Sequence, residues 1–194
     1  MGMNNRGFTL LEVMTASAIL SVLLLTLYGL SEAFAGTAQV QRAKIQGNEE
    51  ARRGVQVVLP LVRMASRSTV NWNQLPGPVL TFRAAEDVDG NGTAVNVGAR
   101  LELGAAITVG PDLQDANEDG VTATQLVMVQ GDVVTVLANH LVAPPGGAQP
   151  TADNSGFWVT PRDAGVELMI RAQGRTARGR VMTTSMSQFA AMRN

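Results

Sequence analysis

The first part of the chain is a long apolar segment with a single acidic residue at its beginning. No charged residue occurs from Val13 to Ser31, and Glu12 directly precedes this stretch. At about 1.5 Å per residue, a slightly tilted helix of this length covers the roughly 30 Å of a bilayer core. We therefore predict a membrane-spanning helix over residues 8–31. A side chain that is ionised deep in a membrane costs about 2.5 kcal/mol or more. Glu12 should therefore have a partner outside its own helix.

The helical pattern continues beyond the apolar segment, but with apolar residues on one face only. These residues recur at helical spacing: Ala51, Val55, Val58, Leu59 and Val62. Polar residues occupy the other faces: Arg52, Arg53, Gln56, Arg63 and Arg67. We predict that residues 32–68 continue the helix and lay the apolar face on a sheet. Gly54 and Pro60 interrupt the pattern, and a proline inside a helix usually bends the axis.

After the helix the pattern becomes alternating, which predicts a β-rich globular domain over residues 69–194. The strand candidates are 79–83, 95–103, 124–130, 133–138, 166–172 and 180–185. Gln130-Gly131-Asp132 predicts a hairpin, and Gln173-Gly174-Arg175 predicts the turn between the last two strands. Residues 144–156 form a long irregular loop. The expected fold class is α+β, with a long N-terminal helix packed on a C-terminal antiparallel sheet.

Length, net charge and cysteine content limit the number of domains, the partners and the means of stabilisation that the chain can have. The 194 residues suffice for one globular domain after the helix. A net charge of −1 gives no broad basic field for nucleic acid. The chain contains no cysteine, so an exported domain would have to be held together without disulfides.

The junction between the polar N-terminus and the apolar helix carries a specific motif. Its residues are Arg6-Gly7-Phe8-Thr9-Leu10-Leu11-Glu12-Val13. In this motif the chain resembles a type IV pilin-like protein. The resemblance implies that a prepilin peptidase removes the leader, residues 1–7, by cleaving between Gly7 and Phe8, and that the new N-terminus is methylated. It also implies that Glu12 pairs with the N-terminal amine of a neighbouring subunit.

The rest of the chain is also similar to pilins in its order of helix and then sheet. The chain most resembles PilW-type minor pilins and the J-type pseudopilins of type II secretion. The resemblance lies in the arginine-rich second half of the helix and in the closing Met192-Arg193-Asn194. The resemblance implies a structural subunit that enters or primes a type IV pilus or a type II secretion pseudopilus. It also implies that the chain is not an enzyme.

The same resemblance implies a set of partners and a location. The partners are other pilin or pseudopilin subunits, the prepilin peptidase and an inner-membrane assembly platform. The subunit would cross the bacterial inner membrane once before assembly and afterwards lie in a fibre in the periplasm or at the cell surface. Neither a DNA ligand nor a surface ligand is identified.

Two other interpretations of the N-terminus remain open. One is a plain membrane anchor. The other is a secretory signal cleaved after Ala33-Phe34-Ala35, although the apolar core of such a signal is only about 7–15 residues long. The chain would then be a secreted or anchored calcium-dependent adhesion module. The mature N-terminal residue distinguishes the interpretations, because it is Phe8 after prepilin cleavage and Gly36 after signal cleavage.

Two acidic turns, residues 87–92 and 115–120, match the first half of a calcium-binding loop. The candidate ligands are Asp87, Asp89, Asn91, Asp115, Asn117 and Asp119. Neither loop has a glutamate at its twelfth position, so a complete site needs a carboxylate from elsewhere: Glu86, Glu102 or Glu118. The alternative is that both are surface turns, the commonest use of Asp, Asn and Gly. No cofactor is required by the sequence, and calcium is the one ion that it suggests.

The sequence offers little for catalysis. His140 is the only histidine, and no Gly-x-Ser-x-Gly motif accompanies it. We therefore expect a surface or packing role for His140. Four arginines bracket the last predicted turn: Arg171, Arg175, Arg178 and Arg180. They fit either a solvated hairpin tip or a basic edge for DNA or a partner.

Overall fold

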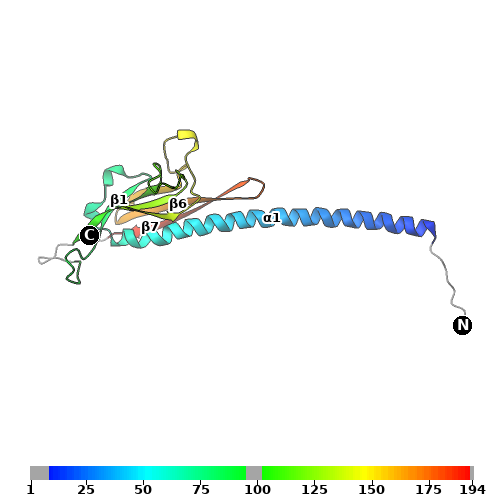
Figure 1. Cartoon of the computed structure of the whole chain (residues 1–194), viewed down its shortest axis with the longest axis horizontal. Helices are drawn as coiled ribbons and strands as arrows, with labels where there is room; N and C mark the ends of the chain where they lie inside the picture. The colour runs from blue at the N-terminus through cyan, green and yellow to red at the C-terminus, as the bar shows by residue number, and fades with distance from the viewer. Residues whose placement is uncertain (1–8, 95–101, 193–194) are drawn as a thin grey trace. The chain divides into compact units, whose positions relative to one another are not determined.

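The computed structural model describes residues 9–94 and 102–192. Its one long helix, α1, runs from Leu10 to Met64 and continues past Pro60. Figure 1 traces α1 from the blue to the cyan part of the chain. The chain divides into two compact units, Met1–Gln41 and Arg42–Asn194. The first half of α1 belongs to the first unit, and the second half belongs to the second unit.

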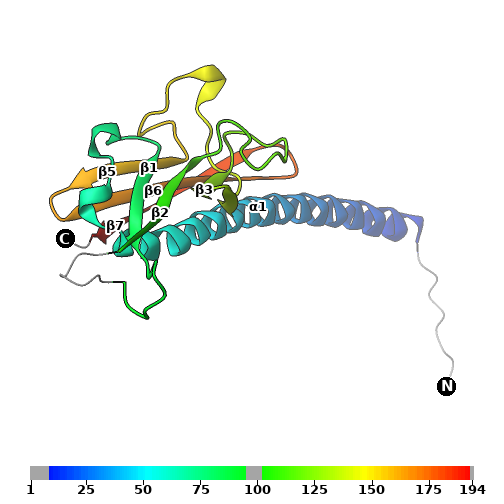
Figure 2. The same cartoon turned by 60° about the vertical axis from the view of Figure 1, so that its left-hand side comes forward.

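The second unit combines the end of α1 with two antiparallel sheets. The first sheet has the order β1-β2-β3-β4, and the second has the order β5-β6-β7. Isolated bridges join Gly77 to Val159 and Leu141 to Ala172. Figure 2 shows β5, β6 and β7 next to one another, with β1, β2 and β3 beside them. The strands are β1 (Leu80–Ala85), β2 (Leu103–Pro111), β3 (Leu126–Gln130), β4 (Val133–Ala138), β5 (Phe157–Arg162), β6 (Gly165–Arg175) and β7 (Val181–Ala191). Short 3-10 turns are η1 (Arg67–Thr69), η2 (Trp72–Gln74) and η3 (Pro145–Gly147).

The predicted α+β class is confirmed, and so is the apolar face of the second half of the helix. Val58 and Val62 are completely buried, and they belong to one hydrophobic core with side chains of both sheets. Alternate residues of β6 contribute to this core, because successive side chains of a strand point to opposite faces: Val166, Leu168, Ile170 and Ala172. The helix ends at Met64, and residues 67–69 form the 3-10 turn η1 instead of the predicted helical continuation to residue 68.

Two glycines mark where α1 lies closest to the sheets. A Cβ atom at Gly54 would lie 2.8 Å from Ile170 Cδ1 on β6. A Cβ atom at Gly174 on β6 would lie 1.9 Å from the Ala43 carbonyl oxygen on α1. Gly174 therefore serves this close approach, and the turn predicted at residues 173–175 is wrong. The chain instead turns between β6 and β7, where the amide of Thr176 donates to the Arg180 carbonyl at 3.0 Å and Gly179 has a φ of 78°.

The other strand predictions have mixed outcomes. The strand at 133–138 and its hairpin with β3 are confirmed, since Gln130 pairs with Val133 and Gly131 adopts a left-handed φ of 59°. Of the strand predicted at 95–103, residues 95–101 lie outside the described part of the chain. Glu102 lies before β2, which begins at Leu103 and extends to Pro111, beyond the predicted end. The sequence pattern missed β5, in which Pro161 is tolerated because β5 is an edge strand of its sheet.

Candidate functional site

The N-terminus of α1 is closed by a reciprocal pair of hydrogen bonds between Thr9 and Glu12. The Glu12 amide donates to Thr9 Oγ1 at 3.3 Å, while the Thr9 amide and Thr9 Oγ1 donate to Glu12 Oε2 at 2.9 and 3.1 Å. This arrangement is a capping box, in which two side chains satisfy amides that the helix itself leaves free.

The capping box changes the interpretation of Glu12. Thr9 supplies donors to Oε2, so Glu12 has a hydrogen-bond partner at the start of its own helix, and the expected partner outside the helix stays a prediction. The capping role of Thr9 was not predicted, although the spacing Thr-x-x-Glu at the start of an apolar helix is the signature of this cap. Both bonds from Thr9 to the Glu12 carboxylate end on Oε2, and the Glu12 side chain is exposed. Glu12 therefore remains accessible to a further donor. Gly7 and Phe8, the predicted processing residues, lie outside the described residues.

The part of α1 that directly follows Glu12, residues 13–31, carries no charged residue and is apolar on every side. Helix α1 contains an 18-residue window with a mean hydropathy of 2.1, and none of this window is buried. Leu11, Leu25 and Tyr28 are each 72% exposed. A helix that is apolar all round is stable in a membrane or among other apolar helices. By its length and composition, α1 is suited to anchoring the chain in a membrane.

The first acidic turn brings Asp87 and Asp89 together with Glu102. One carboxylate oxygen of each lies within 4.8 Å of the others. Hydrogen bonds from backbone amides, first of all that of Gly92, hold the pKa of Asp87 below its usual range. The Asn91 side-chain oxygen accepts two hydrogen bonds from Thr93, at 2.9 and 2.7 Å, which occupy both its lone pairs. Asn91 therefore shapes the loop, and its role as a metal ligand stays a prediction.

The second acidic turn is closed by its own hydrogen bonds. Asp115 accepts the amides of Asp119 and Gly120 at 2.9 to 3.1 Å. Asp119 Oδ2 accepts the side-chain amides of Gln125 and Asn117 at 2.7 and 2.9 Å, and the Gln125 bond is the main cause of a lowered Asp119 pKa. This bonding favours the surface-turn interpretation. The proposed metal role of Asp115, Asn117 and Asp119 stays a prediction.

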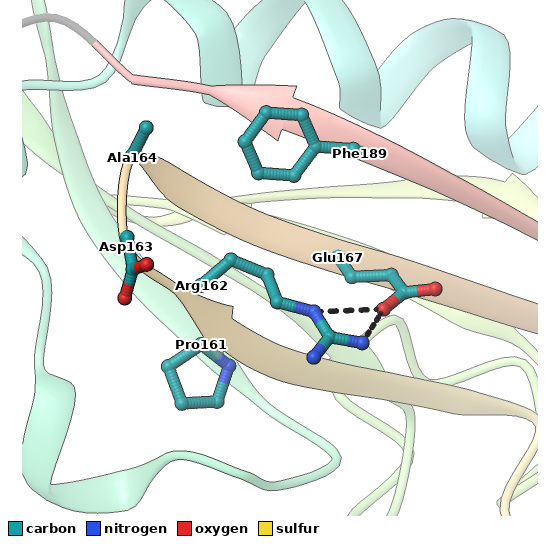
Figure 3. A pocket seen from close by; sticks show the side chains of 6 residues that line it. All are labelled: Pro161, Arg162, Asp163, Ala164, Glu167 and Phe189. Carbon is teal, nitrogen blue, oxygen red and sulfur yellow. Dashed lines mark hydrogen bonds and ion pairs between the residues drawn. The ribbon is translucent and has the colours of Figure 1, made fainter.

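Figure 3 shows a hollow at the end of the β5–β6 hairpin, lined by Pro161, Arg162, Asp163, Ala164, Glu167 and Phe189. Arg162 and Glu167 point toward one another, and Arg162 Nε donates to Glu167 Oε2 at 3.0 Å.

His140, the candidate of the sequence for a surface or packing role, has a left-handed φ of 57°, and its carbonyl oxygen accepts the Gln173 amide at 2.7 Å. Its backbone thus helps to fix the segment after β4 against β6.

Comparison with known proteins gives a match at the N-terminus. Residues 2–28 match the family model of the prokaryotic N-terminal methylation motif. This match covers Gly7, Phe8, Glu12 and the first part of the apolar helix, and the chain thus carries a type IV pilin-like prepilin motif. The motif supports a pilin- or pseudopilin-type precursor that is processed by prepilin peptidase and interacts with other pilin subunits. Neither the curated proteins nor the solved structures gave a match.

Proposed function

We propose that this chain is a minor pilin or pseudopilin, a structural subunit that enters or primes a type IV pilus or a type II secretion pseudopilus. The observation that carries the proposal is the methylation motif at residues 2–28, placed directly on a helix that is exposed and apolar on every side. Such a helix needs lipid or other apolar helices around it. The same segment therefore serves first as an anchor and then as a contact with neighbouring subunits.

The proposed function implies three steps: membrane insertion, cleavage and assembly into a fibre. The precursor crosses the bacterial inner membrane once, is cleaved at Gly7–Phe8, and is transferred by an assembly platform into a fibre in the periplasm or at the surface. A priming or tip position is favoured over the fibre's bulk, because the globular unit is larger than a bulk pilin usually needs. The role is structural rather than enzymatic.

A secreted or anchored calcium-dependent adhesion module is the second candidate. The cluster of the three carboxylates of Asp87, Asp89 and Glu102 favours the adhesion module, since modules outside the cell commonly bind calcium. The mature N-terminal residue separates the two candidates. Mass spectrometry should find Phe8 at the N-terminus, with or without methylation, whereas Gly36 at this position would support the adhesion module.

The function of Glu12 in assembly is tested with two variants that separate its charge from its cap. Glu12→Gln keeps the capping box, because glutamine accepts the same bonds at this position, but it removes the charge. Glu12→Ala removes both. We expect both variants to be inserted and cleaved normally, since losing the charge lowers the cost of insertion. We expect about thirtyfold less of either variant in fibres, or less still, because a desolvated charge pair loses one partner at a cost of about 2 kcal/mol or more.

The assay compares the amount of processed subunit in sheared fibres with the amount left in the membrane fraction, by quantitative mass spectrometry. Equal losses for Glu12→Gln and Glu12→Ala would show that the charge drives incorporation. Wild-type incorporation of Glu12→Gln together with failure of Glu12→Ala would show that only the cap matters and would refute the intersubunit ion pair.

A further inference from the structure

Three carboxylates converge at the connection between β1 and β2. Asp87 and Asp89 follow the end of β1 at Ala85, and Glu102 immediately precedes β2, which begins at Leu103. One oxygen from each lies within 4.8 Å of the others. In the described part of the chain, the ion pairs Arg162–Glu167 and Arg171–Asp153 lie elsewhere, and no arginine or lysine there forms a salt bridge with the three carboxylates. Asp89 accepts the side-chain amide of Asn91 at 2.8 Å and its backbone amide at 3.1 Å, but no positively charged side chain among the described residues compensates the mutual repulsion of the three carboxylates.

Glu102 is an independent sign of a missing partner. The residue is only 5% exposed. Its Oε2 atom accepts the Val88 amide at 2.9 Å, whereas its Oε1 atom is buried and has no hydrogen-bond partner among the described residues. A buried carboxylate oxygen without a partner is costly, so native proteins rarely keep one unless something binds it. The unpartnered oxygen, Oε1, is part of Glu102, the third carboxylate of the cluster with Asp87 and Asp89.

The loop around Asp87 holds this carboxylate in a fixed position. Its oxygens accept the amides of Gly90, Asn91 and Gly92 at 2.8, 3.1 and 2.7 Å. Gly90 and Gly92 have φ values of 75° and 85°, which glycine adopts without steric cost and which turn the chain sharply round the carboxylate. Each carboxylate oxygen has two acceptor sites, so Asp87 Oδ2 retains one for a cation.

We propose that Asp87, Asp89 and Glu102 bind one calcium ion, with water completing its coordination. Two oxygens on the same calcium ion, each at about 2.3–2.6 Å, are at most roughly 5 Å apart, which accommodates the observed cluster. All three ligands are hard oxygen donors, the type that calcium prefers over nitrogen or sulfur. The site is distinct from the N-terminal motif and does not depend on the proposed pilin function.

The bound ion would fasten both ends of the β1–β2 connection. Asp87 and Asp89 lie at its beginning and Glu102 at its end, so one ion would link segments that are far apart in sequence. A chain without cysteine cannot make this link with a disulfide. Calcium is available outside the cytoplasm, and sites in extracellular modules bind it with dissociation constants of about 10⁻⁴–10⁻³ M.

The test measures calcium binding and thermal unfolding of the full chain in detergent. Protein stripped of metal is unfolded with EGTA, with 10 mM calcium chloride or with 10 mM magnesium chloride, and calcium binding is followed by calorimetric titration. Ligand at ten to a hundred times these dissociation constants should raise the unfolding temperature by roughly 3–10 °C. Magnesium should give a smaller shift.

Three variants locate the site. Glu102→Gln keeps the side-chain size and should abolish both the calcium heat and the calcium shift. In EGTA it should unfold at or above the wild-type temperature, since a buried negative charge close to two other carboxylates has been removed. Asp89→Asn changes an exposed residue and should also abolish binding without disturbing the fold. The matched control Asp115→Asn/Asp119→Asn, in the other acidic turn, should keep the full shift.

Several outcomes would overturn the proposal. Identical unfolding curves of the wild-type chain in EGTA and calcium would exclude a stabilising site. A calcium shift that persists in both Glu102→Gln and Asp89→Asn, or disappears in Asp115→Asn/Asp119→Asn, would place the ion elsewhere. A shift with magnesium that equals or exceeds the shift with calcium would reject calcium as the ion.

Discussion

Replacing Gly174 by alanine tests how closely α1 is fitted to β6. A Cβ atom at this position would lie 1.9 Å from the carbonyl oxygen of Ala43, 2.6 Å from its carbonyl carbon and 2.9 Å from its Cα. All three are backbone atoms of a helix, so no change of rotamer relieves the clash. The helix and the strand would have to move apart locally, and this would loosen the packing of the buried face of α1.

The expected size of the effect follows from two opposing contributions. Overpacking a well-packed contact costs typically 1–3 kcal/mol, and a clash between backbones belongs near the upper end, at about 3 kcal/mol. Alanine is favoured over glycine inside a strand by roughly 0.5–1 kcal/mol, which offsets part of this cost. The net loss is about 2 kcal/mol, and for a chain of this size it lowers the unfolding temperature by roughly 4–8 °C.

Two other glycines give graded controls. At Gly54 the nearest atom to an added Cβ is the tip of a flexible side chain, Ile170 Cδ1 at 2.8 Å, and at Gly47 it is Thr184 Oγ1 at 3.3 Å. Both lie in α1, where alanine is favoured over glycine by about 1 kcal/mol. Gly54→Ala should therefore cost less than Gly174→Ala, and Gly47→Ala should be near neutral or slightly stabilising.

The assay is thermal unfolding of the full chain in detergent, followed by tryptophan fluorescence. Trp72 is a suitable probe, because it packs partly against the core and its Nε1 donates to the Arg67 carbonyl at 3.0 Å. If Gly174→Ala unfolded at or above the wild-type temperature, or Gly47→Ala lost more stability than Gly174→Ala, the close approach of α1 and β6 would be refuted.

Two further predictions concern processing and the surface. Gly7→Val should leave an uncleaved, membrane-held precursor, because a side chain next to the scissile bond obstructs the peptidase; N-terminal mass analysis measures this, and normal maturation would contradict the prepilin motif. Arg162→Ala should lower the free energy of unfolding by only roughly 0.2–1 kcal/mol, since the side chains of Arg162 and Glu167 are 56% and 32% exposed. A much larger loss in denaturant titration would show that this pair does more than a surface ion pair.

The parts of the fold that the sequence predicted are those set by local pattern. The helix and its apolar face follow from periodicity over many turns, and the buried Val58 and Val62 confirm it. The β3–β4 hairpin follows from the two-residue turn at Gly131, whose left-handed φ suits glycine. Each of these signals lies within a short window of sequence and needs no knowledge of what packs against it.

The wrong predictions concern residues whose role is fixed by distant contacts. Gly174 looks like a turn glycine in sequence, but its partner is Ala43 on α1. The strand β5 carries Pro161, which argues against a strand unless its position at the edge of a sheet is known. The sequence alone also leaves open which of Glu86, Glu102 and Glu118 lies near Asp87 and Asp89. The pairing of β1 with β2 brings the two ends of their connection together and places Glu102 there.

The hydrogen bonds between Thr9 and Glu12 affect the free energy that an intersubunit contact at Glu12 could contribute to assembly. In the free subunit the Glu12 carboxylate already accepts two bonds from Thr9 at its Oε2 atom. In the proposed assembly, an amine from a neighbouring subunit would meet a carboxylate that already has hydrogen-bond partners. Only the difference in interaction free energy of Glu12 between the free and the assembled subunit would then contribute to assembly. Because the cap bonds need one oxygen only, the other remains for the incoming amine, and both contacts can exist at once. In that case the cap orients Glu12 at the start of α1 before assembly, and the neighbour's amine adds charge compensation when the apolar helices leave the lipid.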